Sequence, residues 1–456
     1  MFLKKAAKTA QTDDASTRAA VEKLLKQVEE GREAAVVKLC KDMDHYEGDI
    51  LVGPEAWSAA IAEVPEQTRK DIQFAHARVK AFAEKQRESI SEFECELTPG
   101  VFAGQKVLPV LTAGCYVPGG RYAHVASAIM TVTTARVAGV KNVIVASPPR
   151  PGGGGVAPAI LYAAKVCGAD QVLSCGGVQA VAALRHGLFT GQPAEVLAGP
   201  GNKYVAEAKR ALFGDVGIDM VAGPTESAVI CDESTDPEMA ATDMVSQAEH
   251  GVNSPCWVIS TSERVARECL AAVPRLIALL PEGSREAAEA AWRDYGEVYV
   301  ATDREDAVRQ SDVYAPEHLE VHCEDLEWWK ARLQNYGSLF VGEETCITYG
   351  DKCAGPNHVL PTKGAARYTG GLNVHKFLKV CSYQRLSKEA NRELGAVAAR
   401  ISRAEGMEAH ARAGDARLAK YFPAERDVLL KEAGAEGAEH VAAWEEGPAA
   451  KSARTK

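Results

Sequence analysis

Residues 195–212 read EVLAGPGNKYVAEAKRAL and contain the pattern that decides the fold. A short apolar run ends in a Gly-Pro-Gly turn, and apolar residues at helical spacing follow it. This order predicts a strand, a glycine-bearing loop and a helix. Glycines let the backbone approach a ligand closely, and the start of the helix offers free N–H groups to an anion. The loop is a candidate phosphate loop, although a plain turn has the same composition.

Three similar units precede this stretch. They are VLPVLTAGCYVPGG (107–120), NVIVASPPR (142–150) and QVLSCGGVQAVAALRHG (171–187). Strands that alternate with helices predict an α/β fold with a parallel sheet covered by helices. Ligands of such sheets bind where the glycine-bearing turns follow the strands. A second α/β stretch is expected from about 227 to 341, with helical segments at both ends of the chain.

Composition narrows the classes of function. The chain has 456 residues, 46% of them hydrophobic, a formal charge of −10 and twelve scattered cysteines without a C-x-x-C motif. The negative charge argues against nucleic acid or an anionic membrane as the main partner. No apolar run approaches the ~18 residues of a membrane-spanning helix. Scattered thiols fit a reducing compartment, so we expect a cytoplasmic protein.

Two segments carry groups suited to chemistry. In SQAEHGVNS, Gln247 and His250 would share one face of a helix, as metal ligands or as part of a buried polar network. In YAPEHLEVH, Glu317 and His318 are adjacent and could move protons if a loop brings both to one site. A solvated glutamate beside a structural histidine is the alternative.

Two later segments add further candidates. The turn-rich YGDKCAGPNHVLPT contains Asp351 and His358, and AEGMEAHARAG places Glu405 and His410 on a late helix. Loops held by a scaffold often carry function. The same residue types are also common in ordinary turns and on exposed helices, so neither segment decides the matter alone.

Read together, eight segments resemble the histidinol dehydrogenase family over about 400 residues. They are GCYVPGG, CGGVQA, GPGNKYV, DMVAGPTE, SQAEHG, APEHLEV, GD…NHVLPT and E…AH. The resemblance implies one zinc ion per subunit, bound by Gln247, His250, Asp351 and His410. It implies proton transfer by Glu317 and His318, NAD contacts at Tyr116, Gln179 and Asn202, and substrate contacts at Thr225, His358 and Glu405.

The resemblance also implies a homodimer and a domain plan. We expect two incomplete Rossmann-like domains. The predicted parts are an N-terminal helical arm (1–24), a larger domain with the zinc and catalytic residues (25–115 and 228–375), an NAD-binding domain (116–227), a C-terminal helical segment that completes the other subunit's site (376–430) and a flexible tail (431–456).

The implied reaction oxidises a primary alcohol through an aldehyde to a carboxylate with two NAD. Where the family usually has small and apolar residues, this chain has Arg121 and His124, and it has Lys363 where an aromatic residue is usual. His375 is a further addition. Arginine suits sulfonate oxygens. The chain thus resembles the branch that converts 2,3-dihydroxypropane-1-sulfonate to 3-sulfolactate. Histidinol oxidation is the alternative within the family, and a zinc hydrolase is the competing class.

Overall fold

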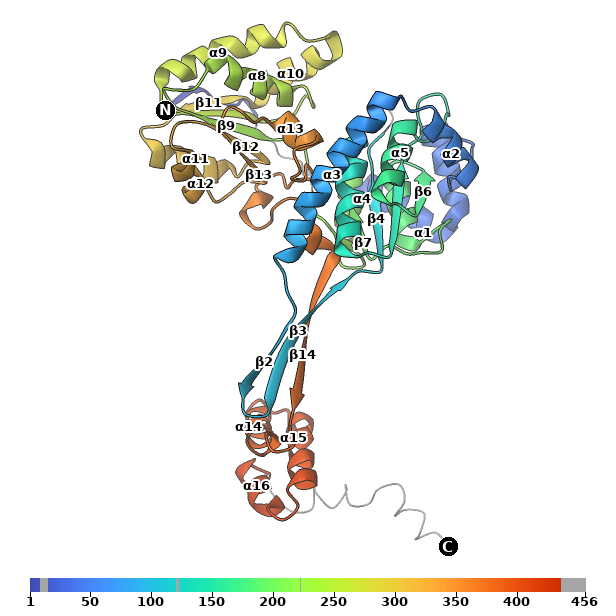
Figure 1. Ribbon diagram of the computed structural model, residues 1–456, viewed down its shortest axis with the longest axis vertical. Coiled ribbons are helices and arrows are strands. Elements are labelled where there is room, and N and C mark those ends of the chain that lie inside the picture. Colours follow the sequence, from blue (N-terminus) through green and yellow to red (C-terminus); the bar gives the residue numbers. More distant parts are fainter. Residues whose placement is uncertain (9–14, 120–122, 222, 436–456) are drawn as a thin grey trace. The chain divides into compact units, whose positions relative to one another are not determined.

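The computed structural model describes residues 1–8, 15–119, 123–221 and 223–435. The chain forms two units (Figure 1). Unit 1 comprises Met1–Ser89 and Pro109–Leu378, and unit 2 comprises Ile90–Leu108 and the chain from Lys379 onward. Unit 1 contains two sheets with helices, one entirely parallel and one parallel except for its edge strand β1, which confirms the predicted α/β class. None of the described helices is long and apolar enough to cross a bilayer.

The smaller sheet of unit 1 is entirely parallel and follows the strand–turn–helix pattern of the sequence. Its strand order is β6-β5-β4-β7-β8. The strands are β4 (Thr112–Tyr116), β5 (Asn142–Ser147), β6 (Gln171–Ser174), β7 (Val196–Ala198) and β8 (Gly217–Ile218). The helices between them are α4 (Val125–Ala138), α5 (Pro158–Cys167), α6 (Gly177–His186) and α7 (Lys203–Leu212).

The N-terminal helices pack against the helices of this smaller sheet. They are α1 (Ala15–Asp44), α2 (Pro54–Ala62) and α3 (Glu66–Glu88). α1 contacts α6 and α7, α2 contacts α5, and α3 contacts α4 and α5. The sequence instead predicts that residues 25–115 belong to the larger domain, together with residues 228–375. An amphipathic stripe shows that a helix packs, but not which sheet receives it.

The larger sheet has the order β1-β11-β10-β9-β12-β13. Its strands are β1 (Phe2–Lys4), β9 (Ser227–Cys231), β10 (Cys256–Ser260), β11 (Glu297–Val300), β12 (His318–His322) and β13 (Ser338–Val341). The associated helices are α8 (Pro237–Ala248), α9 (Glu263–Ile277), α10 (Glu282–Tyr295), α11 (Arg304–Tyr314), α12 (Leu326–Arg332) and α13 (Ile347–Lys352), and two 3₁₀ turns follow at Ala365–Arg367 and Val374–Phe377.

The described part of the expected N-terminal helical arm is not purely helical. Phe2–Lys4 forms β1, which pairs antiparallel with the edge of β11. The Val300 N–H donates to the Met1 carbonyl over 2.7 Å. A strand of three residues is too short for periodicity to reveal. Residues 9–14 lie outside the described chain.

Unit 2 has its own sheet and helices. β2 (Phe93–Thr98), β3 (Val101–Pro109) and β14 (Leu378–Leu386) have the order β14-β3-β2. α14 (Asn391–Ala404), α15 (Glu408–Tyr421) and α16 (Arg426–Glu432) enclose a small core of Ala396, Ala399, Ala411, Leu418, Leu429 and Ala433. The expected C-terminal helical segment thus begins with a strand. The expected tail begins inside α16, and residues 436–456 lie outside the described chain.

A buried ion pair fixes the glycine loop of the opening stretch. Lys209 and Asp219 are each 2% exposed and form a salt bridge. Lys209 Nζ donates to the Gly199 carbonyl over 2.8 Å, and the Gly199 N–H donates to Asp219 Oδ2 over 2.7 Å. Gly199 has a φ of +121°, and a Cβ there would lie 2.0 Å from the Tyr116 carbonyl oxygen. Only glycine therefore permits this approach of the loop to the end of β4.

We predict that Lys209→Met lowers the free energy of unfolding by about 3–5 kcal/mol, because it leaves the Asp219 carboxylate buried without a cation. Urea unfolding followed by circular dichroism would show a lower midpoint. Lys85→Met, which removes a cation from the exposed pair with Glu88, is the control and should leave the midpoint in place. An equal midpoint for Lys209→Met would contradict the role of this pair.

Candidate active site

The predicted acid–base pair lies at the start of β12. His318 is the first residue of β12 and Glu317 precedes it, and both are buried. Glu317 Oε2 is 3.6 Å from His318 Nδ1. The two side chains therefore reach the same site, which is the condition for both to take part in proton transfer. This end of the larger sheet is the amino end of β9 and β12, whereas ligands of open α/β sheets usually bind at the carboxyl end. The C-terminal turn of α8 returns to the same end.

The His318 ring is held in one orientation. Nδ1 lies 3.1 Å from the Glu226 carbonyl oxygen. A carbonyl only accepts, so Nδ1 carries the hydrogen and Nε2 presents the lone pair when the ring is neutral. Nε2 has no hydrogen-bond partner among the described residues and is 3.6 Å from Asp351 Oδ1. Burial lowers the pKa of His318, but the Glu317 and Asp351 carboxylates outweigh it and raise that pKa to about 9.

Glu226 is a member of this cluster that the sequence analysis missed. Its N–H donates to Glu317 Oε2 over 3.1 Å, and its own Oε1 accepts the Lys363 N–H over 2.9 Å. Burial raises the pKa of Glu317 to about 8 and that of Glu226 to about 7. Two buried carboxyls with raised pKa values beside an imidazole are a common arrangement for proton transfer. The signal in the sequence was the position of Glu226 at the start of an apolar strand.

Three of the four predicted zinc ligands belong to this part of unit 1. Gln247 lies in the last turn of α8, and its Oε1 is buried without a hydrogen-bond partner in the described chain. α8 ends at Ala248, so His250 follows the helix instead of lying on it as expected. Burial lowers the pKa of His250, and the Asp351 carboxylate opposes that effect. An unpaired buried oxygen, an imidazole and a carboxylate fit the donor preferences of zinc.

The remaining predicted ligand, His410, and the predicted substrate contact Glu405 lie in unit 2. His410 is exposed near the start of α15, and Glu405 is exposed directly after α14. The zinc-binding role of His410 and the substrate contact of Glu405 both stay predictions.

Other predicted substrate contacts surround the cluster. His358 Nδ1 donates to the Asp351 carbonyl over 2.8 Å, and Nε2 of the same ring lies 3.0 Å from Ser127 Oγ. Burial lowers the pKa of His124, and the charge of nearby His358 lowers it further. Thr225 is half-buried and precedes Glu226. Arg121 lies outside the described residues. His375 instead contacts Ser89 Oγ and the Gln86 carbonyl at the end of α3.

The predicted NAD contacts lie where strands of the smaller sheet end. Tyr116 ends β4, and its hydroxyl accepts the Gly177 N–H over 3.2 Å. Gln179 donates to Asp44 Oδ2 over 3.2 Å, a partner that the sequence analysis missed. Asn202 caps α7, since its Oδ1 accepts the N–H groups of Tyr204 and Val205. Within the described chain, the side-chain amide N–H groups of Asn202 have no partner. These residues line the edge that dinucleotides use in open α/β sheets.

Comparisons with known proteins agree with this geometry. The model of the histidinol dehydrogenase family matches residues 7–418. The chain is 57% identical over 421 residues to a histidinol dehydrogenase homolog of Pelagibacter ubique (strain HTCC1062), across 92% of this chain and 98% of the relative. It is 54% identical over 424 residues to the sulfopropanediol 3-dehydrogenase of Ruegeria pomeroyi, across 93% and 97%. The crystal structure of histidinol dehydrogenase from Elizabethkingia anophelis superposes with a TM-score of 0.84 at 31% identity, covering 91% and 94%.

An α/β chain with this buried cluster of two carboxyls and a histidine, and with these relatives, is a NAD-dependent dehydrogenase. It belongs to the histidinol dehydrogenase family, whose members oxidise an alcohol by four electrons and typically use NAD and zinc. The resemblance seen in the sequence is therefore confirmed at the level of the family.

We predict that Glu226→Ala opens the turn at Lys363, because the Lys363 N–H loses its acceptor while its backbone keeps a positive φ of 56°. Limited digestion with trypsin should then cleave after Lys363 faster than in the wild type. Glu226→Gln keeps an oxygen acceptor and should resist like the wild type. Equal cleavage of the alanine variant and the wild type would contradict this account of the turn.

Proposed function

We propose that this enzyme oxidises 2,3-dihydroxypropane-1-sulfonate to 3-sulfolactate with two NAD per substrate. The observation that carries the proposal is the 54% identity to a sulfopropanediol 3-dehydrogenase over 97% of that relative. Oxidation of L-histidinol to L-histidine is the alternative, supported by the name of the family. A zinc hydrolase does not agree with membership of a dehydrogenase family. The scattered free cysteines support a cytoplasmic enzyme.

Positive charge near the cluster supports an anionic substrate. The charge of Lys352 lowers the pKa values of His124, His250 and His358, after the larger effect of burial. A second cation, Lys363, acts in the same way on Glu226. These two cations favour a sulfonate over the cationic histidinol, whereas the Asp351 carboxylate acts in the opposite direction on His250 and His358. We propose that Arg121 and His124 bind the sulfonate, and that Thr225 and His358 contact the rest of the substrate.

We propose that Gln247, His250 and Asp351 bind zinc together with His410 from the second subunit of a homodimer. Zinc, when bound, supplies Lewis-acid coordination that holds the substrate hydroxyls in place through both oxidations. Glu405 comes from the same helical segment as His410, and it suits a hydroxyl of the substrate but not the sulfonate. The C-terminal segment would then complete the neighbouring site.

His318 acts as a proton acceptor in both halves of the reaction, and the second half needs Glu317 as well. In the first half, Nε2 of His318 takes the proton of the primary hydroxyl while hydride leaves the same carbon for the first NAD. In the second half, Glu317 takes a proton from a water molecule as the water oxygen bonds to the aldehyde carbon. Nε2 of His318 then takes the remaining hydroxyl proton as a second hydride leaves that carbon for the second NAD, which gives the carboxylate. The raised pKa makes Glu317 a stronger base than an ordinary carboxylate. Tyr116, Gln179 and Asn202 would hold the NAD.

We predict that Glu317→Gln impairs oxidation of the aldehyde more than oxidation of the alcohol, because only the second half needs activated water. His318→Gln should slow both halves by about 10²–10⁴-fold, the usual effect of losing a general base. Single-turnover NADH formation from the alcohol and from the aldehyde would measure both. Small and equal effects of the two substitutions would remove the proposed roles.

We also predict that Arg121→Ala raises KM for the sulfonate about ten- to a hundredfold, since a charge-assisted hydrogen bond contributes about 1.5–3 kcal/mol. KM for NAD should change little. Arg121→Lys keeps the charge without the paired N–H groups and should lie between the alanine variant and the wild type. Unchanged KM in the alanine variant would show that Arg121 does not bind the substrate.

A further inference from the structure

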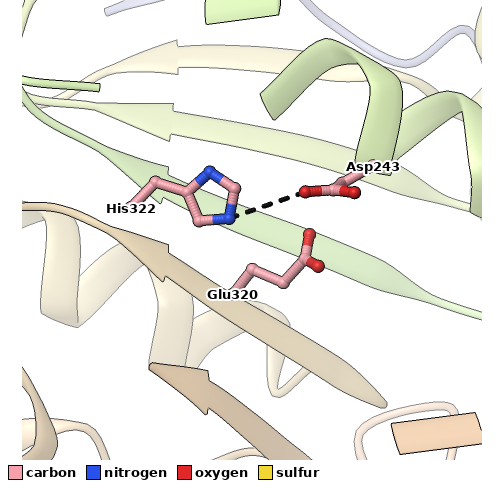
Figure 2. Close-up of side chains that lie close together, drawn as sticks. All are labelled: Asp243, Glu320 and His322. Carbon is pink, nitrogen blue, oxygen red and sulfur yellow. Dashed lines mark ion pairs between the residues drawn. The ribbon is translucent and has the colours of Figure 1, made fainter. Parts of the chain in front are cut away.

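Three buried ionisable side chains lie close together between α8 and β12 of unit 1. None of them is one of the proposed catalytic residues. Asp243 comes from the middle of α8, and Glu320 and His322 come from β12. One donor atom from each lies within 4.8 Å of the others, and His322 Nε2 is 3.6 Å from Asp243 Oδ2. Figure 2 shows the three side chains turned toward one another.

These groups lack the partners that buried polar atoms normally have. His322 is 1% exposed and Glu320 is fully buried. Neither ring nitrogen of His322 has a hydrogen-bond partner among the described residues, and neither does Glu320 Oε2. The other oxygen, Oε1, accepts the Ile347 N–H over 3.2 Å. Unpaired buried polar atoms are uncommon in native proteins, and a bound ion would pair these.

We propose that Asp243, Glu320 and His322 bind a divalent transition-metal ion at a site separate from the zinc site of Gln247, His250 and Asp351. Two carboxylates would neutralise the charge of the ion, and a neutral imidazole is a common ligand of zinc and its neighbours in the periodic table. Donor atoms around a tetrahedral zinc lie about 3.4 Å apart, as follows from metal–ligand distances of about 2.1 Å. The 3.6 Å between His322 and Asp243 is close to that spacing.

The site would join three elements that carry the proposed catalytic residues. α8 supplies Asp243 and, one turn later, Gln247. β12 supplies Glu320 and His322, and its first residue is His318. Glu320 also accepts from the first residue of α13, the helix that contains Asp351. An ion held by buried side chains exchanges only when the surrounding structure opens. We therefore expect it to leave the folded enzyme far more slowly than an ion at an accessible site.

The alternative is a shared proton. Asp243 and Glu320 could hold one proton between them beside a neutral His322, with no ion at all. The metal content of the enzyme distinguishes the two cases.

The full-length enzyme would be saturated with Zn²⁺, freed of loosely bound ions by gel filtration, and analysed by mass spectrometry of its metals before and after long exposure to EDTA. We expect His322→Leu and Glu320→Gln to contain one zinc per subunit less than the wild type. After EDTA the wild type and His250→Ala should each retain one zinc per subunit. Ser311→Ala, which removes another buried hydroxyl that has no partner in the described chain, should match the wild type.

Wild-type zinc content in the two variants, with native circular dichroism, would overturn the proposal in favour of the shared proton. If these variants do not fold, the EDTA experiment decides by itself. One zinc per subunit that remains in both the wild type and His250→Ala supports the buried site. A wild type or a His250→Ala variant that loses all its zinc to EDTA while folded overturns it.

Discussion

The position of β12 between β9 and β13 in the larger sheet constrains the proposed site more than any other feature. Its backbone pairs in parallel with β9 on one side and β13 on the other. All five residues of the strand are buried, and three of them are ionisable. Because every side chain of this strand is buried, each polar one must find a partner inside the protein. This explains why the Glu226 backbone, Asp351 and Asp243 gather around a single strand.

Two clusters of polar side chains lie along one face of β12. His318, Glu320 and His322 alternate with apolar residues and point to the same side of the sheet. At the first position the ring meets the Glu226 carbonyl and the carboxylates of Glu317 and Asp351. Further along, Glu320 and His322 lie close to Asp243, and Glu320 accepts a hydrogen bond from the backbone of α13. The proposed proton transfer takes place at the first end, and the proposed ion lies at the other.

The sequence predicted the repeated strand–turn–helix units well, because apolar runs bounded by glycine leave few alternatives. It also indicated Glu317, His318 and Gln247, since unusual polar residues within apolar segments are visible in a single chain. It did not reveal Glu226 or Asp44, whose partners lie 91 and 135 residues away in the chain. The placement of the N-terminal helices and the three-stranded sheet of unit 2 likewise depend on contacts that no local pattern encodes.

The central claim is that this family member oxidises an anionic diol by four electrons. The most direct measurement is the ratio of NADH formed to substrate consumed, with the product identified by mass spectrometry. The account predicts two NADH for each 2,3-dihydroxypropane-1-sulfonate, 3-sulfolactate as the product, and little NADH from L-histidinol under the same conditions. Two NADH from each L-histidinol, and none from the sulfonate, would contradict it.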